Sequence, residues 1–356
     1  MSTPSDADEP STAGWQAIQA AVEPLYPGHE PAHFGTILSM RLGGRDPLDG
    51  ISAYRATQPR PHWHFVTFGM SELYDKESDV AEWSGWGFEF TFRLARDTGE
   101  PPDAQPPMWA LSFLQNLARY VVNTGNVFEP NHYMDLNGPI ALETQTAITA
   151  AFFASDPQLP EITTPNGRLK FVQVVGVTND ELSAAQAWDV EKFIATLARV
   201  NPMLVTDLVR RSILDDPAIA EAVRRGQRSD GSSTGVLYND NVAWSEPAAG
   251  RLEITLGAKQ ADVLKMLLAG RVPFGRPFVL QGPNAAVEFK PAEMVAWQPR
   301  GDGGVTVDVT SAAAQQLIDH IRPKQGLYAL DARVIVRVVP SLIRDHEGKV
   351  AQTIGE

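Results

Sequence analysis

Alternation of apolar and polar positions is strongest in residues 61–94, where it predicts two neighbouring β-strands. In the second of them one strand face carries Trp86, Phe88, Phe90 and Phe92. The opposite face carries Gly87, Glu89, Thr91 and Arg93. Because an aromatic side chain buries on the order of 150–250 Å², we expect this pair of strands to form the nucleus of the larger core.

Helical spacing appears on both sides of these strands. Trp15, Ile18 and Val22 recur at intervals of three and four and predict a short amphipathic helix, ended by prolines. Residues 109–122 carry one continuous apolar stripe and give the clearest helical pattern in the chain. Further strands are predicted at 148–153 and 169–177.

The remainder of the chain predicts a second group of strands with interspersed helices, at 259–269 and 311–321. The fold class is therefore α+β: two mixed α/β domains, with mostly antiparallel or mixed sheets and flanking helices. The expected divisions are a disordered N-terminal segment at 1–13, an N-terminal domain at 14–235, a linker at 236–250, a smaller C-terminal α/β domain at 251–342 and a tail at 343–356.

Composition and charge exclude or disfavour several classes of function. The 356 residues suit about two domains, and 43% hydrophobic residues suffice for a sizeable core. Thirty Lys and Arg against 43 Asp and Glu give a net charge of -13, which disfavours nucleic-acid binding because phosphates require a basic surface. The absence of cysteine excludes disulfides, thiolate metal sites and cysteine nucleophiles. The glycine-rich run near 43–50 lacks a phosphate-loop ending, so no cofactor is predicted.

The sequence also sets an expectation for location. The first ten residues are acidic and hold no apolar run, so they predict neither a signal peptide nor a transit peptide. No stretch approaches the roughly 18 apolar residues of a transmembrane helix. The expected location is the cytoplasm, and no membrane partner is predicted.

Two histidines are the strongest candidates for chemistry. His62 and His64 are two positions apart, so a strand places both imidazoles on one face, where they could hold a metal. The nearest acids in the sequence, Glu72 and Asp75, lie beyond a turn, and no H-E-x-x-H spacing is present. The alternative is a pair of histidines buried in the strand and hydrogen-bonded to backbone and loops. We therefore expect no enzyme, and keep a metal-dependent hydrolase using His62 and His64 as the alternative function.

Several of these segments together resemble a known family. They are His62-Trp63-His64, the sequence FGMSELY at 68–74, GFEFTFRL at 87–94 and LQNLARYV at 114–121. In this order they resemble the signature of the Suppressor of fused (SUFU) family, especially its bacterial members. The sequence LVTDL at 204–208 is similar to a strand of the same family.

The resemblance implies a binding function. Members of the family have two α/β-type domains, and a partner's extended peptide adds as a β-strand in the cleft between them. Carried over position by position, the groove residues of animal members fall on Tyr120, Asn131, His132, Ser155 and Asp156. Asn131 and Ser155 stand where the animal proteins have acids, so the scaffold is matched but its peptide specificity is not.

The leading hypothesis is therefore a non-catalytic scaffold that binds another protein through an extended peptide or a toxin domain. The resemblance to bacterial members implies an immunity protein that neutralises a bacterial toxin, and an acidic surface would suit a basic nuclease toxin. A scaffold that self-associates through strand edges is a further alternative.

Overall fold

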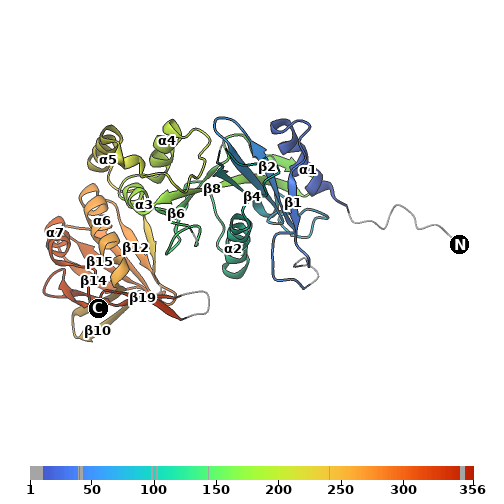
Figure 1. The fold of residues 1–356 in the computed structure, drawn as a ribbon. Helices are drawn as coiled ribbons and strands as arrows, with labels where there is room; N and C mark the ends of the chain where they lie inside the picture. The colour runs from blue at the N-terminus through green and yellow to red at the C-terminus, as the bar shows by residue number, and fades with distance from the viewer. Residues whose placement is uncertain are drawn as a thin grey trace. The chain divides into compact units, whose positions relative to one another are not determined.

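A computed structural model describes residues 11–38, 40, 43–97, 99–101, 103–142, 144–239, 241–344 and 349–356. The chain forms two compact units (Figure 1). The first unit takes residues 1–182 and 194–212, and the second takes residues 183–193 and 213–356. Both combine helices with sheets, which confirms the α+β fold class. In the described part of the chain, no helix is both long and apolar enough to cross a bilayer.

The first unit is built on one mixed sheet. Its strand order is β1-β2-β3-β4-β8-β6-β5, with β7 paired to β8. All neighbours are antiparallel except β4 and β8. The strands are β1 (Ala32–Gly35), β2 (Gly50–Ala56), β3 (His62–Phe68), β4 (Trp83–Ala95), β5 (Tyr133–Asp135), β6 (Ile148–Ser155), β7 (Ile162–Thr164) and β8 (Gly167–Thr178). The predicted strand pair over 61–94 is confirmed as β3 and β4, with Phe65 opposite Phe92.

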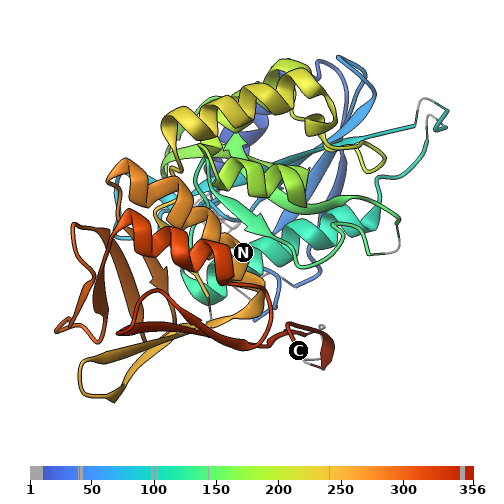
Figure 2. The ribbon, with the colours of Figure 1, turned by 90° about the vertical axis from the view of Figure 1, so that its left-hand side faces the viewer.

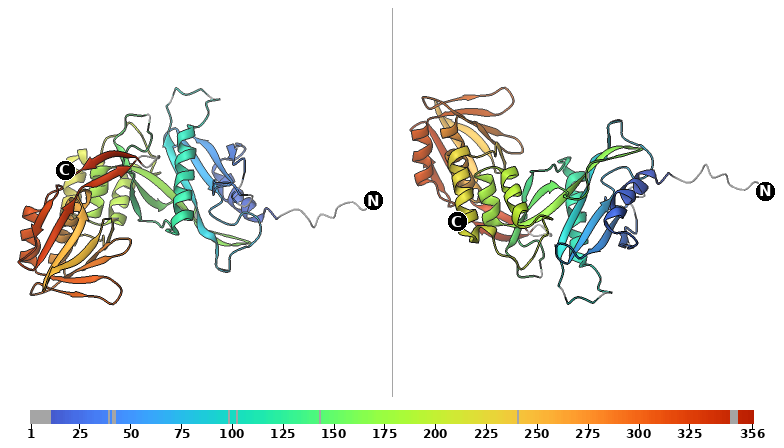
Figure 3. Two further views of the ribbon diagram at one scale, coloured as in Figure 1. Left: turned by 90° about the horizontal axis from the view of Figure 1, so that it is seen from below. Right: turned by 90° about the horizontal axis from the view of Figure 1, so that it is seen from above.

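Helices cover both faces of this sheet (Figure 3). The helix α2 (Met108–Thr124) packs Leu114 and its neighbours against Phe65 and Phe92, as the apolar stripe predicted. On the opposite face α1 (Ala13–Val22) and the 3-10 turn η1 (Glu23–Leu25) pack against Phe68. The sheet therefore lies between two apolar layers, and its central strands have no face in contact with water.

Strand β4 differs from the expected amphipathic strand in two ways. Trp86 is 38% exposed rather than buried with the three phenylalanines. The register between β4 and β8 shifts between Trp83 and Phe88, and Gly87 has a positive φ of 80°, so the strand bulges at this point. The polar face is also buried: Glu89, Thr91 and Arg93 are all 0% exposed. The layer containing α1 covers that face, whereas polar–apolar alternation alone would predict that it is exposed to solvent.

Glu89 keeps its place in the interior by accepting hydrogen bonds. Its carboxylate receives the N–H of Gly69 (3.0 Å), Met70 (3.3 Å) and Ser71 (2.9 Å), and the hydroxyls of Ser71 (2.6 Å) and Thr67 (2.7 Å). Burial raises the pKa of Glu89, and the donors around it act in the opposite direction. These contacts fix the turn that follows β3.

The expected strand at 204–208 is a single parallel bridge between Leu94 and Thr206. Thr206 N donates to Arg93 O (2.7 Å), and Ala95 N donates to Thr206 O (2.8 Å). On its other side, the Thr206 hydroxyl accepts from Gly176 N (2.8 Å). Thr206 thus lies where β4 and β8 diverge. Among the described residues, the pairing of this segment with β4 is limited to that single bridge.

The second unit packs helices against two sheets around one core (Figure 2). One sheet has the order β10-β11-β17-β16 and the other β14-β15-β13-β12-β9. The strands are β9 (Val236–Tyr238), β10 (Ala243–Ala248), β11 (Arg251–Gly257), β12 (Phe278–Gln281), β13 (Ala286–Pro291), β14 (Ala296–Pro299), β15 (Val305–Val309), β16 (Gly326–Ala329) and β17 (Val334–Val339). A separate hairpin joins β18 (Ser341–Arg344) to β19 (Val350–Ile354).

The principal helices of this unit are α5 (Pro217–Asp230), α6 (Ala261–Arg271) and α7 (Ser311–His320). Of these, α6 and α7 agree to within two residues with the helices predicted at 259–269 and 311–321. Short 3-10 turns lie at η3 (Ile213–Asp215), η4 (Ala258–Gln260) and η5 (Val272–Phe274). Two more helices, α3 (Asn179–Gln186) and α4 (Val190–Val200), have residues in both units.

The segments expected to join or end the domains hold regular structure where they are described. Residues 236–250, expected as a linker, contain β9 and β10, which pair with β12 and β11. In the expected tail at 343–356, β19 pairs with β18. Residues 345–348 of that tail and residues 1–10 of the expected N-terminal segment lie outside the described residues.

Candidate partner-binding site

The terminal strand β5 positions two of the predicted residues. It pairs antiparallel with β6, with Tyr133 opposite Phe152, and all three of its residues are half-exposed. The pairing continues outside the strand, where Asn131 N donates to Phe153 O (2.7 Å) and Phe153 N donates to His132 O (2.9 Å). Asn131 has a φ of 74°, a conformation that Asn tolerates better than most residues. Asn131 and His132 are therefore fixed beside β6 at the end of the sheet.

An aromatic column connects Tyr120 to the same place. The Tyr120 ring, near the end of α2, lies 5.5 Å from the ring of Phe128. Phe128 in turn stacks on Phe153, with ring centroids 3.9 Å apart. Tyr120 remains 37% exposed and its hydroxyl accepts from Asn126 Nδ2 (3.2 Å). The column anchors the loop before β5 to the core and leaves the phenol at the surface.

His132 and Ser155 are both exposed. The His132 Nδ1 accepts the backbone N–H of Glu129 (3.2 Å), so the neutral ring carries its proton on Nε2. Ser155 ends β6, two positions after Phe153, and so lies on the same strand face. The structure thus gathers four of the five predicted residues around β5, β6 and the end of α2: Tyr120, Asn131, His132 and Ser155.

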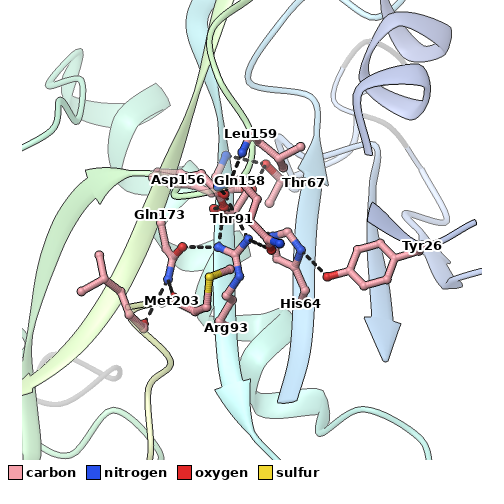
Figure 4. Close-up of polar contacts among 12 residues, drawn as sticks. Tyr26, His64, Thr67, Thr91, Arg93, Asp156, Gln158, Leu159, Gln173 and Met203 are labelled. Carbon is pink, nitrogen blue, oxygen red and sulfur yellow. Dashed lines mark hydrogen bonds and ion pairs between the residues drawn. The ribbon is translucent and has the colours of Figure 1, made fainter. Parts of the chain in front are cut away.

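Asp156, the fifth predicted residue, is inside the first unit (Figure 4). Its carboxylate receives both terminal nitrogens of Arg93 (2.6 and 3.0 Å) and the hydroxyl of Thr91 (2.7 Å). It also accepts the N–H of Gln158 (2.8 Å) and Leu159 (3.0 Å) and so holds the turn after β6. The Arg93 and Asp156 side chains are both 0% exposed, so this carboxylate positions the turn next to Ser155 and is closed to solvent.

Arg93 connects this carboxylate to three other segments. Its guanidinium donates to the side-chain oxygens of Gln173 on β8 and Gln158 in the turn. The Gln173 amide donates onward to the carbonyls of Met203 (2.9 Å) and Leu204 (3.0 Å). Burial alone would raise the pKa of Asp156, but the neighbouring His64 and Arg93 outweigh it and hold that pKa well below its usual range. The buried pair is therefore ionised at neutral pH.

The two candidate metal ligands belong to this interior. His64 Nδ1 lies 2.8 Å from the Tyr26 hydroxyl, and His64 Nε2 lies 3.5 Å from Asp156 Oδ2. His62 Nδ1 lies 2.8 Å from Arg60 O. Burial, reinforced for His64 by the charge of Arg93, lowers both pKa values to about 4, so both rings are neutral at pH 7. Both histidines are buried in the strand, as the alternative interpretation expected. Each has a hydrogen bond at Nδ1, whereas neither Nε2 has one within the described residues.

The hydrolase alternative is not supported by this geometry. Among the described residues, no three His, Cys, Asp or Glu side chains lie together in a group that could hold a metal ion. The group next to His64 and Asp156 is instead the Arg93 guanidinium, and a fixed cation at this position disfavours a second one. The sequence offered one signal for this network that pattern analysis did not use, namely an arginine in the middle of a strand of phenylalanines.

The fold and the site define an α+β protein with a mixed sheet that ends in a half-exposed strand. A sequence profile described as Suppressor of fused protein (SUFU) matches residues 44–211. The human Suppressor of fused homolog is 36% identical over 252 residues, which cover 65% of this chain and 51% of the human protein. The match thus spans about half the length of the curated relative.

Solved structures give the same result. A chain from the Sufu-Fu complex crystal structure is 31% identical, with a TM-score of 0.56, covering 60% of this chain and 98% of that one. The crystal structure of Drosophila Suppressor of Fused is similar in fold, with a TM-score of 0.76 at 22% identity, covering 92% of this chain and 97% of that one. The chain belongs to the Suppressor of fused family.

Proposed function

We propose that this chain is a non-catalytic binding protein that holds a partner protein through an extended segment added beside β5. The observation that carries the proposal is the position of β5 as the last strand of the sheet, with Tyr120, Asn131 and His132 fixed around it. The related chain was crystallised in the Sufu-Fu complex, which supports the same class of function.

Strand addition suits the backbone of β5. The hydrogen bonds of His132 O and Leu136 N to β6 fix the alternation, so the N–H and C=O of Tyr133 point away from β6. A partner strand would take affinity from such backbone groups and selectivity from the side chains beside them. Asn131 and Ser155 are neutral, so a basic side chain of the partner segment would find no carboxylate at these two positions. The Tyr120 hydroxyl and the His132 ring offer hydrogen bonds to its polar groups instead.

A narrower form of the proposal concerns the partner's identity. We propose an immunity role, in which the bound partner is a toxin domain. The support is electrostatic: a net charge of -13 attracts a basic nuclease and speeds its association. The test is co-expression with the product of the neighbouring gene, with growth as the measurement. Rescue of growth is expected, whereas continued killing in the presence of the folded protein would remove the immunity role.

The binding proposal is tested by co-purification from the native cell with the intact chain and two variants, Tyr120→Ala and His132→Ala. Loss of a buried aromatic anchor costs about 2 kcal/mol or more, so the partner's Kd should rise about thirtyfold for Tyr120→Ala. His29→Ala, another exposed histidine of the first unit, is the matched control and should bind as the wild type does. Equal capture by all variants, with unchanged circular dichroism, would contradict binding at β5.

A further inference from the structure

A groove lies at the other end of the same sheet from β5. It has a volume of about 580 Å³ and flanks the terminal strand β1, whereas β5 ends the sheet on the opposite side. On the strand side it is lined by Phe34, Ile37 and Leu38, and on the helix side by Met108, Leu111 and Gln115. Its size is that of an ordinary ligand or peptide pocket, roughly 300–1,000 Å³.

The helix wall of this groove is one regular stripe of α2. Met108, Leu111, Gln115 and Arg119 follow each other at helical spacing, so they share one face of the helix. Met108 is 62% exposed, and Ile37 on the facing segment is fully exposed. Since β1 is the last strand of the sheet, a strand added beside it would lie about 4.8 Å further out, on the side where this groove opens.

The outer edge of β1 can accept such a strand. Thr36 N donates to Asp49 O (2.8 Å), and Phe34 lies opposite Ile51 in the same register. Since ladder partners alternate in an antiparallel pair, the N–H and C=O of His33 and Gly35 point away from β2. Within the described ranges, neither of these two residues has a backbone hydrogen bond on that outer side.

We propose that an extended segment of a partner protein adds as a strand beside β1 and places alternate apolar side chains in this groove. Arg45 lines the groove and is exposed, and among the described residues no carboxylate pairs with it. Arg119 differs, because it already pairs with Asp46 at 2.9 Å. The partner segment therefore carries an acidic residue that meets Arg45. A second copy of this chain is disfavoured as the occupant, because each copy carries a net charge of -13.

The experiment selects binders for the intact chain from a displayed library of random twelve-residue peptides, then measures the enriched peptides by calorimetry and amide hydrogen exchange. Enriched sequences should alternate apolar residues and contain Asp or Glu, and binding should slow exchange at the amides of His33 and Gly35. Gly35→Pro removes the outward N–H and leaves the β1–β2 ladder intact. It should weaken binding about fivefold, the worth of one backbone hydrogen bond. Arg45→Glu should weaken binding at least tenfold.

Gly35→Ala is the matched control, because it keeps the N–H and its Cβ would meet no atom closer than 3.9 Å. It should bind as the wild type does. Tyr120→Ala should also leave this binding intact, which separates the β1 groove from the site at β5. The proposal is overturned if no peptide is enriched, or if enriched peptides are insensitive to Gly35→Pro and Arg45→Glu. Dimers in light scattering that Gly35→Pro abolishes would also overturn it, in favour of a second copy.

Discussion

The buried pair of Arg93 and Asp156 allows a quantitative prediction for Asp156→Ala. Both side chains are 0% exposed, and they share two hydrogen bonds of 2.6 and 3.0 Å. Removing the carboxylate leaves the guanidinium charged, buried and held only by the neutral oxygens of Gln158 and Gln173. The loss of one partner from such a pair costs about 3–5 kcal/mol. In a unit of this size that cost lowers Tm by roughly 10 °C.

A second variant separates the charge from the turn that Asp156 also holds. Asp156→Asn keeps an oxygen for the N–H groups of Gln158 and Leu159 but turns an NH₂ group towards the Arg93 guanidinium. It should therefore be nearly as unstable as Asp156→Ala. The double variant with Arg93→Met removes the unpaired charge and should recover part of the loss, by about 1–3 kcal/mol of coupling.

Urea unfolding followed by circular dichroism gives the free energies, and amide hydrogen exchange assigns the loss to the first unit. Glu253→Ala is the control, since its ion pair with Arg337 (2.7 Å) lies at the surface of the second unit and should contribute less than about 1 kcal/mol. The reasoning would be refuted if Asp156→Asn were as stable as the wild type, or if Asp156→Ala and Arg93→Met had additive effects.

Two further predictions concern other buried groups. The pKa values of His62 and His64 are lowered to about 4 from 6.5, so between these values the unfolded chain binds more protons and stability falls as pH falls. The loss of stability is about 2 kcal/mol per histidine from pH 6.5 to 5. His62→Gln should flatten the dependence of the urea midpoint on pH, whereas the control His29→Gln, at an exposed histidine, should not. A wild-type urea midpoint that does not change with pH would contradict the reasoning. Glu89→Gln turns an NH₂ group towards backbone donors and should cost about 1–3 kcal/mol in the same unfolding assay, whereas the exposed Glu82→Gln should cost little.

The sequence predicted where helices and strands lie better than it predicted which strand faces are buried. Period-two spacing identified β3 and β4, and the apolar stripe identified α2, because both patterns are local. The burial of the polar face of β4 was not predictable in this way. Arg93 is tolerated inside only because Asp156 and Gln173, 63 and 80 positions away in the chain, meet it there. Pairings over such separations leave no periodic trace in one sequence.

The candidate site shows the same division. For chemistry, composition and spacing gave the histidine pair as the strongest candidate, and its neighbours proved to be Tyr26 and Arg60, which the pattern did not connect to it. Tyr120, Asn131 and His132 came from family resemblance. The grouping of these three depends on Phe128 and Phe153, whose stacking is a tertiary contact.

The path of the chain through the two units has a consequence for synthesis. Residues 183–193 belong to the second unit but are translated before residues 194–212, which complete the first. On the ribosome the first unit cannot be finished until residue 212 has emerged. Residues 183–193 then still lack their partners downstream, among them Asp230 of α5, which accepts from Trp188 Nε1 (2.8 Å), and Ser232, whose hydroxyl donates to Gln186 O (2.6 Å). A gene fragment ending at residue 212 would therefore encode a first unit whose residues 183–193 lack these hydrogen-bond partners. We expect the two units to be inherited, expressed and degraded together.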